Sequence, residues 1–113
     1  MGQILKQRDI ILVPFLYTDQ SGLKRRPAVV MSSDAFNRSY SDIIICGITS
    51  FDNGDPILLP VKKEDWTDGL WSESYVNPAY VASLDLKLVI KRIGRLRKER
   101  FDELMQKFKR IFD

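Results

Sequence analysis

Histidine is absent from this chain of 113 residues, and cysteine occurs only once, as Cys46. The lack of histidine removes the commonest general acid and base, and a single cysteine excludes an intramolecular disulfide and the ordinary zinc sites. Cys46 lies in the apolar run DIIICGI, where cysteine usually behaves as a small buried hydrophobic residue. The carboxylates form no recognisable metal-binding motif. We therefore expect no metal and no cofactor, and any chemistry must use other side chains.

Long apolar runs are also missing from the chain. No stretch approaches the roughly 18 consecutive apolar residues of a membrane-spanning helix. The first residues, MGQILKQRDI, lack the apolar segment of a signal peptide. We expect a cytoplasmic protein with no membrane role. With 44% hydrophobic and 29% charged residues, the chain fits one domain that covers residues 1–113.

The formal net charge of +3 is too small to indicate a nucleic-acid partner by itself, so the distribution of charge matters more. Between Lys87 and Arg100 the chain carries seven basic residues and one acid, Glu99. This basic stripe is either a track for the phosphates of a nucleic acid or a solvated rim, and the sequence leaves both interpretations open.

The apolar pattern is typical of short strands separated by polar turns. Six segments are rich in β-branched and aromatic residues or alternate in polarity. They cover residues 9–17, 27–33, 42–51, 56–61, 74–86 and 87–96. We count six or seven strands, which favours a small closed or partly closed barrel. The segment 42–51 is almost continuously apolar and is expected inside the sheet, whereas Pro14 indicates an edge or a bulge.

The carboxyl end of the chain changes period. From about residue 98 to residue 112, apolar residues recur at helical spacing and charges of both signs fill the other face. Such a helix packs on the barrel or across a dimer rather than on a membrane. We therefore predict a mainly β fold with a carboxyl-terminal helix.

The densest local charge stands directly before the second predicted strand. Lys24, Arg25 and Arg26 follow the polar loop TDQSG and precede Pro27. Proline favours extended geometry in the residue before it, so Arg26 is expected to enter the strand with a fixed direction, while Lys24 and Arg25 stay on the loop. A fixed arginine beside mobile cations suits phosphate, because its planar fork binds two oxygens at once. The alternative is that the three cations only solubilise the start of the strand.

Two hydroxyls, Thr49 and Ser50, end the third predicted strand. They either close hydrogen bonds to the neighbouring backbone or donate to charge that develops on a phosphate. Other polar residues are candidate neighbours, although their spacing does not show which of them meet. These are Asp19, Ser21, Ser32, Ser33, Asp34 and Asp85.

In this order, the segment DIILVPFLYTDQSGLKRRPAVVMSS, the strand end GITS and the amphipathic helix resemble the MazF/PemK-type toxins of toxin–antitoxin pairs. The resemblance extends from Asp9 to Phe112. Its most specific parts are RRPAVV after a polar loop and the threonine at the end of the next strand. The family usually opens its first strand with Gly-Asp, whereas this chain has Arg8-Asp9.

The resemblance implies an SH3-like small β-barrel related to the gyrase poison CcdB, which works as a homodimer. It also implies a sequence-selective, metal-independent endoribonuclease that cleaves single-stranded RNA and is neutralised by a cognate antitoxin. Arg26 and Thr49 match the catalytic pair of the family. The residues expected to contact substrate are Ser21, Lys24, Arg25 and Ser50.

Such a reaction needs no activated water, because the 2′-hydroxyl of RNA attacks the adjacent phosphate and leaves a cyclic phosphate and a 5′-hydroxyl end. The protein must supply in-line geometry, charge stabilisation and proton transfer. The resemblance assigns proton transfer to the arginine, and Lys24 or Asp19 are further candidates. Residues 18–25 are expected to close over unstacked bases. The candidate stacking partners are Tyr17, Phe51 and Trp71.

Two other functions fit parts of the same sequence. One is a CcdB-like toxin that binds gyrase and cleaves nothing, but a pure binder has no need for RRP and GITS together. The other is a non-catalytic module that binds RNA or an antitoxin, since the presence of motif residues does not guarantee an assembled site.

Overall fold

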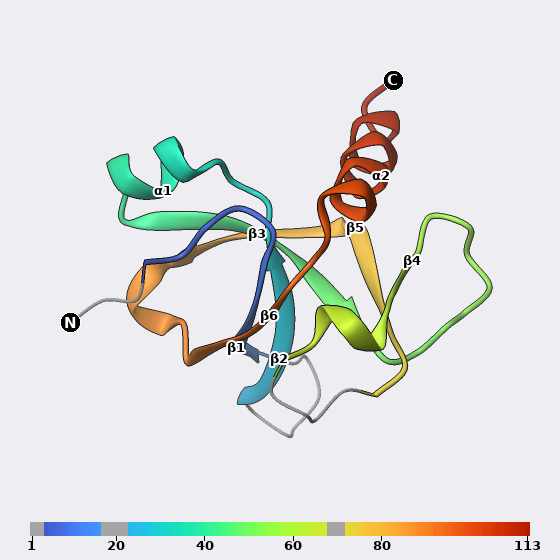
Figure 1. The fold of residues 1–113 in the computed structure, drawn as a ribbon, viewed down its shortest axis with the longest axis horizontal. Helices are drawn as coiled ribbons and strands as arrows, with labels where there is room; N and C mark the ends of the chain where they lie inside the picture. The colour runs from blue at the N-terminus through green and yellow to red at the C-terminus, as the bar shows by residue number, and fades with distance from the viewer. Residues whose placement is uncertain (1–3, 17–22, 68–71) are drawn as a thin grey trace.

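The computed structural model describes residues 4–16, 23–67 and 72–113, which contain six strands and two α-helices (Figure 1). The strands are β1 (Asp9–Leu16), β2 (Leu23–Val30), β3 (Asp42–Thr49), β4 (Leu59–Val61), β5 (Ser74–Asp85) and β6 (Lys91–Arg95). The helices are α1 (Asp34–Ser39) and α2 (Lys98–Arg110), and the short 3₁₀ turns are η1 (Lys63–Asp65) and η2 (Leu86–Leu88). Each segment predicted as a strand overlaps one of these six strands, and all but the second, residues 27–33, contain the whole strand.

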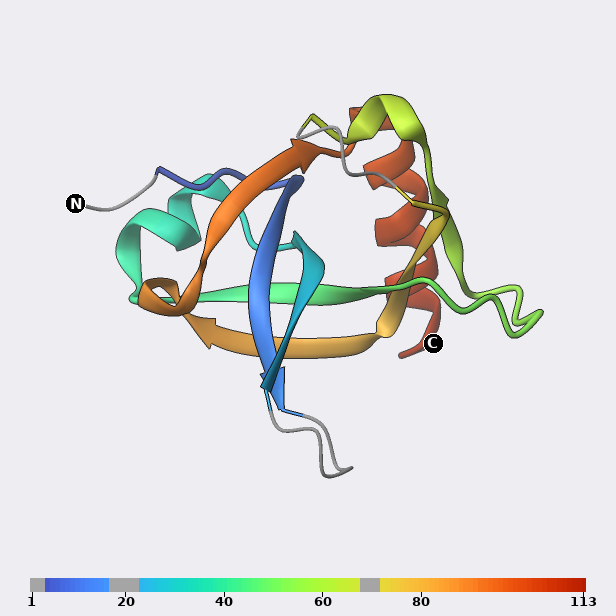
Figure 2. The same cartoon turned by 90° about the horizontal axis from the view of Figure 1, so that it is seen from below.

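The strands form one antiparallel sheet in the order β4-β5-β3-β2-β1-β6. β3 lies inside the sheet, as its apolar sequence predicts. The sheet curls until its two edges meet, because Trp66, beyond β4, forms an isolated bridge with Gly94 of β6. The amide of Thr67 also donates to the carbonyl of Ile93 at 2.8 Å. Figure 2 shows the strands curving around a common interior, so the predicted small, partly closed barrel is confirmed.

Gly94 permits this closure because it has no side chain. A Cβ atom built at Gly94 would overlap the carbonyl oxygen of Asp65 and lie only 3.0 Å from the Cα atom of Trp66. The two backbones therefore approach each other more closely than any residue with a Cβ atom allows. The contact fixes the position of Trp66 relative to β6.

Buried side chains of the central strands alternate between two apolar clusters, as the period of a strand requires. One cluster is closed by α2, and the other is covered by partly buried residues around η2. The first includes Ile10, Val29, Cys46 and Leu104, and the second includes Ile11, Val30 and Ile45. β3 thus contributes to both, and the predicted burial of Cys46 is confirmed.

Helix α2 packs on the barrel through its apolar face, as its sequence predicts. Phe101 and Leu104 are buried, and burial of one such side chain contributes about 2 kcal/mol to folding. The helix ends at Arg110, two residues before the predicted end. Among the residues that the structure describes, no helix is long and apolar enough to cross a membrane.

The start of β2 differs from its prediction. The strand begins at Leu23, so the backbones of Lys24 and Arg25 lie in the sheet and pair with Phe15 and Pro14 of β1. The prediction of a loop at these positions was wrong because pairing with β1 outweighs the polar composition of the segment. Pro14 lies beyond the end of the β1–β6 ladder, where its missing N–H removes no hydrogen bond with β6, which fits the predicted edge position.

Arg8 adopts the left-handed conformation, with φ at 81°. Hydrogen bonds hold its backbone in place, since its amide donates to Val30 and its carbonyl accepts from Leu96. The guanidinium donates from Nη1 to the carbonyl of Leu96 at 3.1 Å. A glycine would adopt this backbone without a steric penalty, so the conformation accounts for the glycine that the family usually has before Asp9.

Candidate active site

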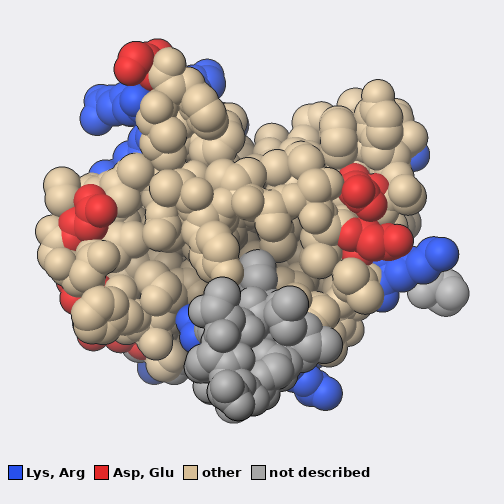
Figure 3. Space-filling model, turned by 180° about the vertical axis from the view of Figure 1, so that it is seen from behind, with Lys and Arg blue, Asp and Glu red and all other residues tan. Residues whose placement is uncertain are grey.

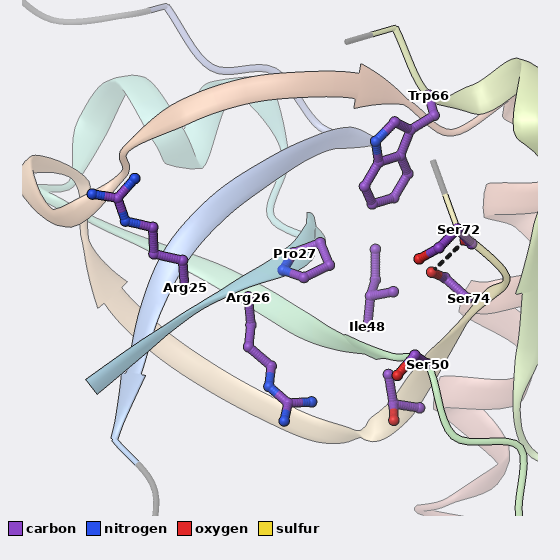
Figure 4. Close-up of a pocket in the computed structure, with 9 residues that line it drawn as sticks. Arg25, Arg26, Pro27, Ile48, Ser50, Trp66, Ser72 and Ser74 are labelled. Atoms are coloured by element: carbon purple, nitrogen blue, oxygen red, sulfur yellow. Dashed lines mark hydrogen bonds between the residues drawn. The ribbon is translucent and has the colours of Figure 1, made fainter. Parts of the chain in front are cut away.

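A cavity of about 230 Å³ opens where β2, the end of β3 and the segments around Trp66 and Ser74 meet. Its described lining consists of Arg25, Arg26, Pro27, Ile48, Thr49, Ser50, Trp66, Ser72 and Ser74 (Figure 4). Four residues predicted to carry chemistry therefore line one cavity. They are Arg25, Arg26, Thr49 and Ser50.

The antiparallel register of β2 and β3 explains why Arg26 and Thr49 line the same cavity. Ala28 pairs with Gly47 at the end of the ladder between these strands. Two residues back along β2 is Arg26, and two residues forward along β3 is Thr49, so the same register assigns them equivalent positions. Both residues therefore lie just beyond the same end of the ladder, where both line the cavity.

The two arginines of β2 point in different directions. Successive side chains of a strand alternate between its faces, and Figure 4 shows Arg25 and Arg26 extending to opposite sides of β2. Arg26 is half-buried and Arg25 is exposed. One cation is thus partly shielded at the cavity, while the other reaches solvent beside it.

Thr49 already makes one local hydrogen bond. Its Oγ1 accepts from the amide of Phe51 at 3.1 Å, which is the backbone-closing role that the sequence left open. This bond uses a lone pair of the hydroxyl and leaves its hydrogen for donation. The side chain is half-buried, and the backbone of Thr49 pairs with Tyr75 of β5. The hydroxyl is therefore held in place and retains the capacity to donate.

Several predicted residues lie outside the described part of the chain. Asp19, Ser21, Tyr17 and Trp71 are among them, and so is the side chain of Lys24. Phe51, a predicted stacking residue, is described but is not among the residues that line the cavity, and it is 70% exposed.

The other half of the cavity was not predicted from the sequence. Trp66 and Ile48 form an apolar wall with Pro27, and the hydroxyls of Ser72 and Ser74 lie beside it (Figure 4). Trp66 reaches this position through the bridge to Gly94, a contact between residues far apart in the sequence. The only sign of this close approach in the sequence is Gly94, a glycine inside the predicted strand 87–96.

The basic stripe from Lys87 to Arg100 is partly structural. The Oδ1 atom of Asp9, which is fully buried, accepts from the Nε atoms of Arg92 and Arg95, both at 3.0 Å. Arg97 lies 3.6 Å from a carboxylate oxygen of Asp65, also buried. These arginines balance buried acids, a role that neither interpretation of the sequence included.

The described surface carries no large basic patch on the face seen in Figure 3. There, acidic and basic side chains lie around the rim, and the middle of the face is mostly uncharged. The described residues that line the cavity, in contrast, include two arginines and no acid. The cavity therefore combines positive charge with hydroxyl donors.

Two titratable groups, one in β3 and one in β5, have shifted pKa values. Burial raises the pKa of the Cys46 thiol to about 12. Burial, with Glu73 and Asp52 nearby, raises the pKa of the Tyr75 phenol, so that both groups stay protonated at neutral pH. Within the described ranges, no group of three or more Cys, Asp or Glu side chains is placed to hold a metal ion.

The family model of the PemK-like, MazF-like toxins of type II toxin–antitoxin systems matches residues 6–112. The chain therefore belongs to this family, as the resemblance in its sequence predicts. No curated protein sequence matches the chain.

Solved structures share the fold at low sequence identity. The MazE–MazF structure (Form-II) from Deinococcus radiodurans has a TM-score of 0.81 and 18% identity, over 98% of this chain and 97% of that chain. The Form-III structure from the same organism has a TM-score of 0.79 and 22% identity, over 97% of each chain. An endoribonuclease from a mycobacterial species has a TM-score of 0.77 and 13% identity, over 99% of this chain and 94% of that chain. At these identities the comparisons establish the fold.

Proposed function

We propose that this chain is a toxin that cleaves single-stranded RNA at selected sequences without a metal ion, and that a cognate antitoxin neutralises it. The observation that carries the proposal is the cavity that both Arg26 and Thr49 line. Family membership and the fold shared with a mycobacterial endoribonuclease support it.

The RNA itself supplies the nucleophile. The 2′-oxygen attacks the adjacent phosphorus and loses its proton, the bond from phosphorus to the 5′-oxygen breaks, and that oxygen gains a proton. The products are a cyclic phosphate and a 5′-hydroxyl end. Arg26 binds the non-bridging oxygens with its planar fork and stabilises the charge that develops on them. Loss of one such donor typically costs about 3 kcal/mol, or roughly a hundredfold in rate.

The neighbouring residues position the substrate. Thr49 donates its hydroxyl hydrogen, which the bond from Phe51 leaves unused, to the same phosphate. Ser50 contacts the RNA chain beside that phosphate. Arg25 extends to the other side of β2, where it binds an adjacent phosphate. Lys24, at the start of β2, and Ser21, which precedes β2 in the sequence, also contact the substrate.

Proton transfer requires a group that gains and loses protons, and the described lining of the cavity contains no carboxylate. Arg26 takes this role by family resemblance, with Lys24 or Asp19 sharing it. If Asp19→Ala and Lys24→Ala together leave the single-turnover rate unchanged, neither side chain takes part.

We also propose that the protein acts in the cytoplasm as a homodimer and that its antitoxin carries an acidic, extended segment. Such a segment competes with RNA because it meets the same positive charge. The D. radiodurans relatives are MazE–MazF structures, which supports an antitoxin partner. Sedimentation of the purified protein tests the dimer.

The test is cleavage of a long single-stranded RNA in EDTA. The unmodified protein is expected to make discrete cuts with 5′-hydroxyl ends. Arg26→Ala is expected to slow them at least about a hundredfold. Arg26→Lys, which keeps the charge but loses the fork, should recover only part of the rate. Thr49→Val should slow cleavage, and Thr49→Ser should restore it. An absence of cuts with the folded protein over a broad set of RNAs would overturn the proposal.

A further inference from the structure

The cavity has two chemically different halves. Arg26 and Thr49 belong to the half that carries charge and hydroxyl donors. The other half is apolar, with the indole of Trp66 directed toward Ile48 and the ring of Pro27 (Figure 4). A nucleotide has the same division, because its phosphate is charged and the flat faces of its base stack on apolar surfaces.

The backbone on both sides fixes the position of Trp66. Its amide donates to the carbonyl of Lys63 at 3.1 Å, and the next residue, Thr67, donates to Ile93 of β6. The close approach at Gly94 lets the chain pass at this point. The indole is thus attached to a closed part of the barrel, which preorganises it for a ligand.

The indole nitrogen has no hydrogen-bond partner among the described residues, although it is buried. Buried tryptophans usually satisfy this donor, and leaving it unpaired costs about 1–3 kcal/mol. No polar contact therefore accounts for the position of this ring. The ring is half-buried: part of it packs against the apolar cluster closed by α2, and the part that lines the cavity is available to a ligand.

Ser74 adds a polar group to the apolar half. The residue is only 5% exposed, and its hydroxyl donates to the carbonyl of Ser72 at 2.8 Å. Because this bond uses the hydrogen, the lone pairs of the Ser74 oxygen remain as acceptors. Each nucleobase carries its N–H groups at different positions on its edge, so a fixed acceptor can pair with some bases and not with others.

We propose that Trp66 is the surface on which the base next to the cleaved phosphate stacks, and that Ser74 accepts a hydrogen bond from the edge of that base. This inference rests on the proposed function and names the residues that determine its sequence preference. Single-stranded RNA is recognised through unstacked bases on aromatic side chains, and one base fits beside a phosphate held at Arg26.

Fluorescence tests the stacking directly. The chain has two tryptophans, so Trp71→Phe leaves Trp66 as the one reporter. The probe is a short RNA that spans a mapped cut, with a 2′-deoxynucleotide at the cut so that it binds without cleavage. We expect quenching of Trp66 on binding. An abasic site at one position beside the cut should abolish the quenching and weaken binding roughly tenfold to a hundredfold, while abasic sites farther away should not.

Variants test the role in specificity. Trp66→Ala is expected to lower kcat/KM roughly tenfold or more and to relax the base preference at that one position, whereas Trp66→Phe retains it. Ser74→Ala should change the base preference at the same position of the RNA. Tyr40→Ala is the matched control, because Tyr40 is an aromatic residue that is 60% exposed and stacks on Phe36 of α1, away from the cavity.

The outcomes separate the two proposals. If the unmodified protein cuts RNA but the intact and abasic probes quench Trp66 to the same extent, the stacking role is wrong and the proposed function stands. A folded Trp66→Ala variant with the original cut pattern would also show that the stacking role is wrong, as would loss of the preference in Phe51→Ala instead. If the unmodified protein neither cuts nor binds RNA, the proposed function and this inference both fail.

Discussion

Strand β1 has an arginine-bearing strand on each side, and the two sets of arginines differ in what they meet. On β6, Arg92 and Arg95 both donate to the buried carboxylate of Asp9. On β2, Arg26 lines a cavity whose described lining has hydroxyls and apolar groups but no acid. The density of cations in the sequence is similar at both places, so the surroundings distinguish them: the β6 arginines neutralise a buried carboxylate, whereas Arg26 lines a cavity.

The largest effect on stability is expected at Asp9. Asp9→Ala removes the acceptor for two guanidinium groups and for the amide of Lys6, which donates at 2.8 Å. We expect the free energy of unfolding to fall by about 3 kcal/mol, measured by urea denaturation. The control is Asp102→Ala, which breaks an exposed pair with Lys98 and should cost less than about 0.5 kcal/mol. Equal losses of stability in the two variants would show that the buried ion pairs of Asp9 contribute no more than an exposed pair.

The closure that links β6 to Trp66 is tested by Gly94→Ala. The added methyl group overlaps the carbonyl of Asp65, so the two backbones must separate. We expect a loss of about 2 kcal/mol in the free energy of unfolding. Gly54→Ala is the comparison, because Gly54 has a φ of 80° but no neighbour within 4 Å, and should cost about 1 kcal/mol from backbone strain alone. A smaller loss at Gly94 than at Gly54 would contradict the tight closure.

Cys46 is a titratable group buried without a counter-charge, in contrast to Asp9. Burial raises the pKa of its thiol from 9.0 to about 12. The unfolded chain therefore releases this proton first as the pH rises, and the stability that comes from burying the neutral thiol is complete below pH 9 and declines from 9 to 12. The free energy of unfolding should fall by up to about 1.4 kcal/mol per pH unit in that range relative to Cys46→Ala. Parallel pH profiles of the two proteins would disprove this.

The smallest effect is expected at Arg8, which precedes Asp9 in the sequence. Arg8→Gly and Arg8→Ala both lose the guanidinium bond to Leu96, but only glycine adopts a φ of 81° without strain. Arg8→Gly should therefore be more stable than Arg8→Ala by about 1 kcal/mol. At most positions the order is reversed, because alanine restricts the unfolded chain more than glycine does. Thermal unfolding of the two variants measures the difference, and a more stable alanine variant would show that no strain is present.

The sequence predicted what depends on local pattern. Alternating and apolar runs indicated the strands, and helical spacing indicated α2. The motif around Arg26 and the strand end at Thr49 identified four residues of the cavity, Arg25, Arg26, Thr49 and Ser50. They line it together because β2 and β3 are antiparallel neighbours.

Contacts between distant residues were not predictable in the same way. Asp9 lies at the opposite end of the sequence from Arg92 and Arg95. The sequence therefore gave no sign that this acid neutralises part of the basic stripe. Trp66 reaches the cavity only because the backbone closes at Gly94. Both depend on how the two edges of the sheet are placed, which no local spacing encodes.

The most direct test compares Arg26→Ala with Arg92→Ala, which remove the same side chain from the two strands that flank β1. For each variant, the cleavage rate on RNA in EDTA and the free energy of unfolding are measured together. Arg26→Ala should lose at least about a hundredfold in rate and change stability by less than about 1 kcal/mol, whereas Arg92→Ala should lose stability and keep its rate. An Arg26→Ala protein that cleaves RNA at the original rate would contradict the role of Arg26 at the cleaved phosphate.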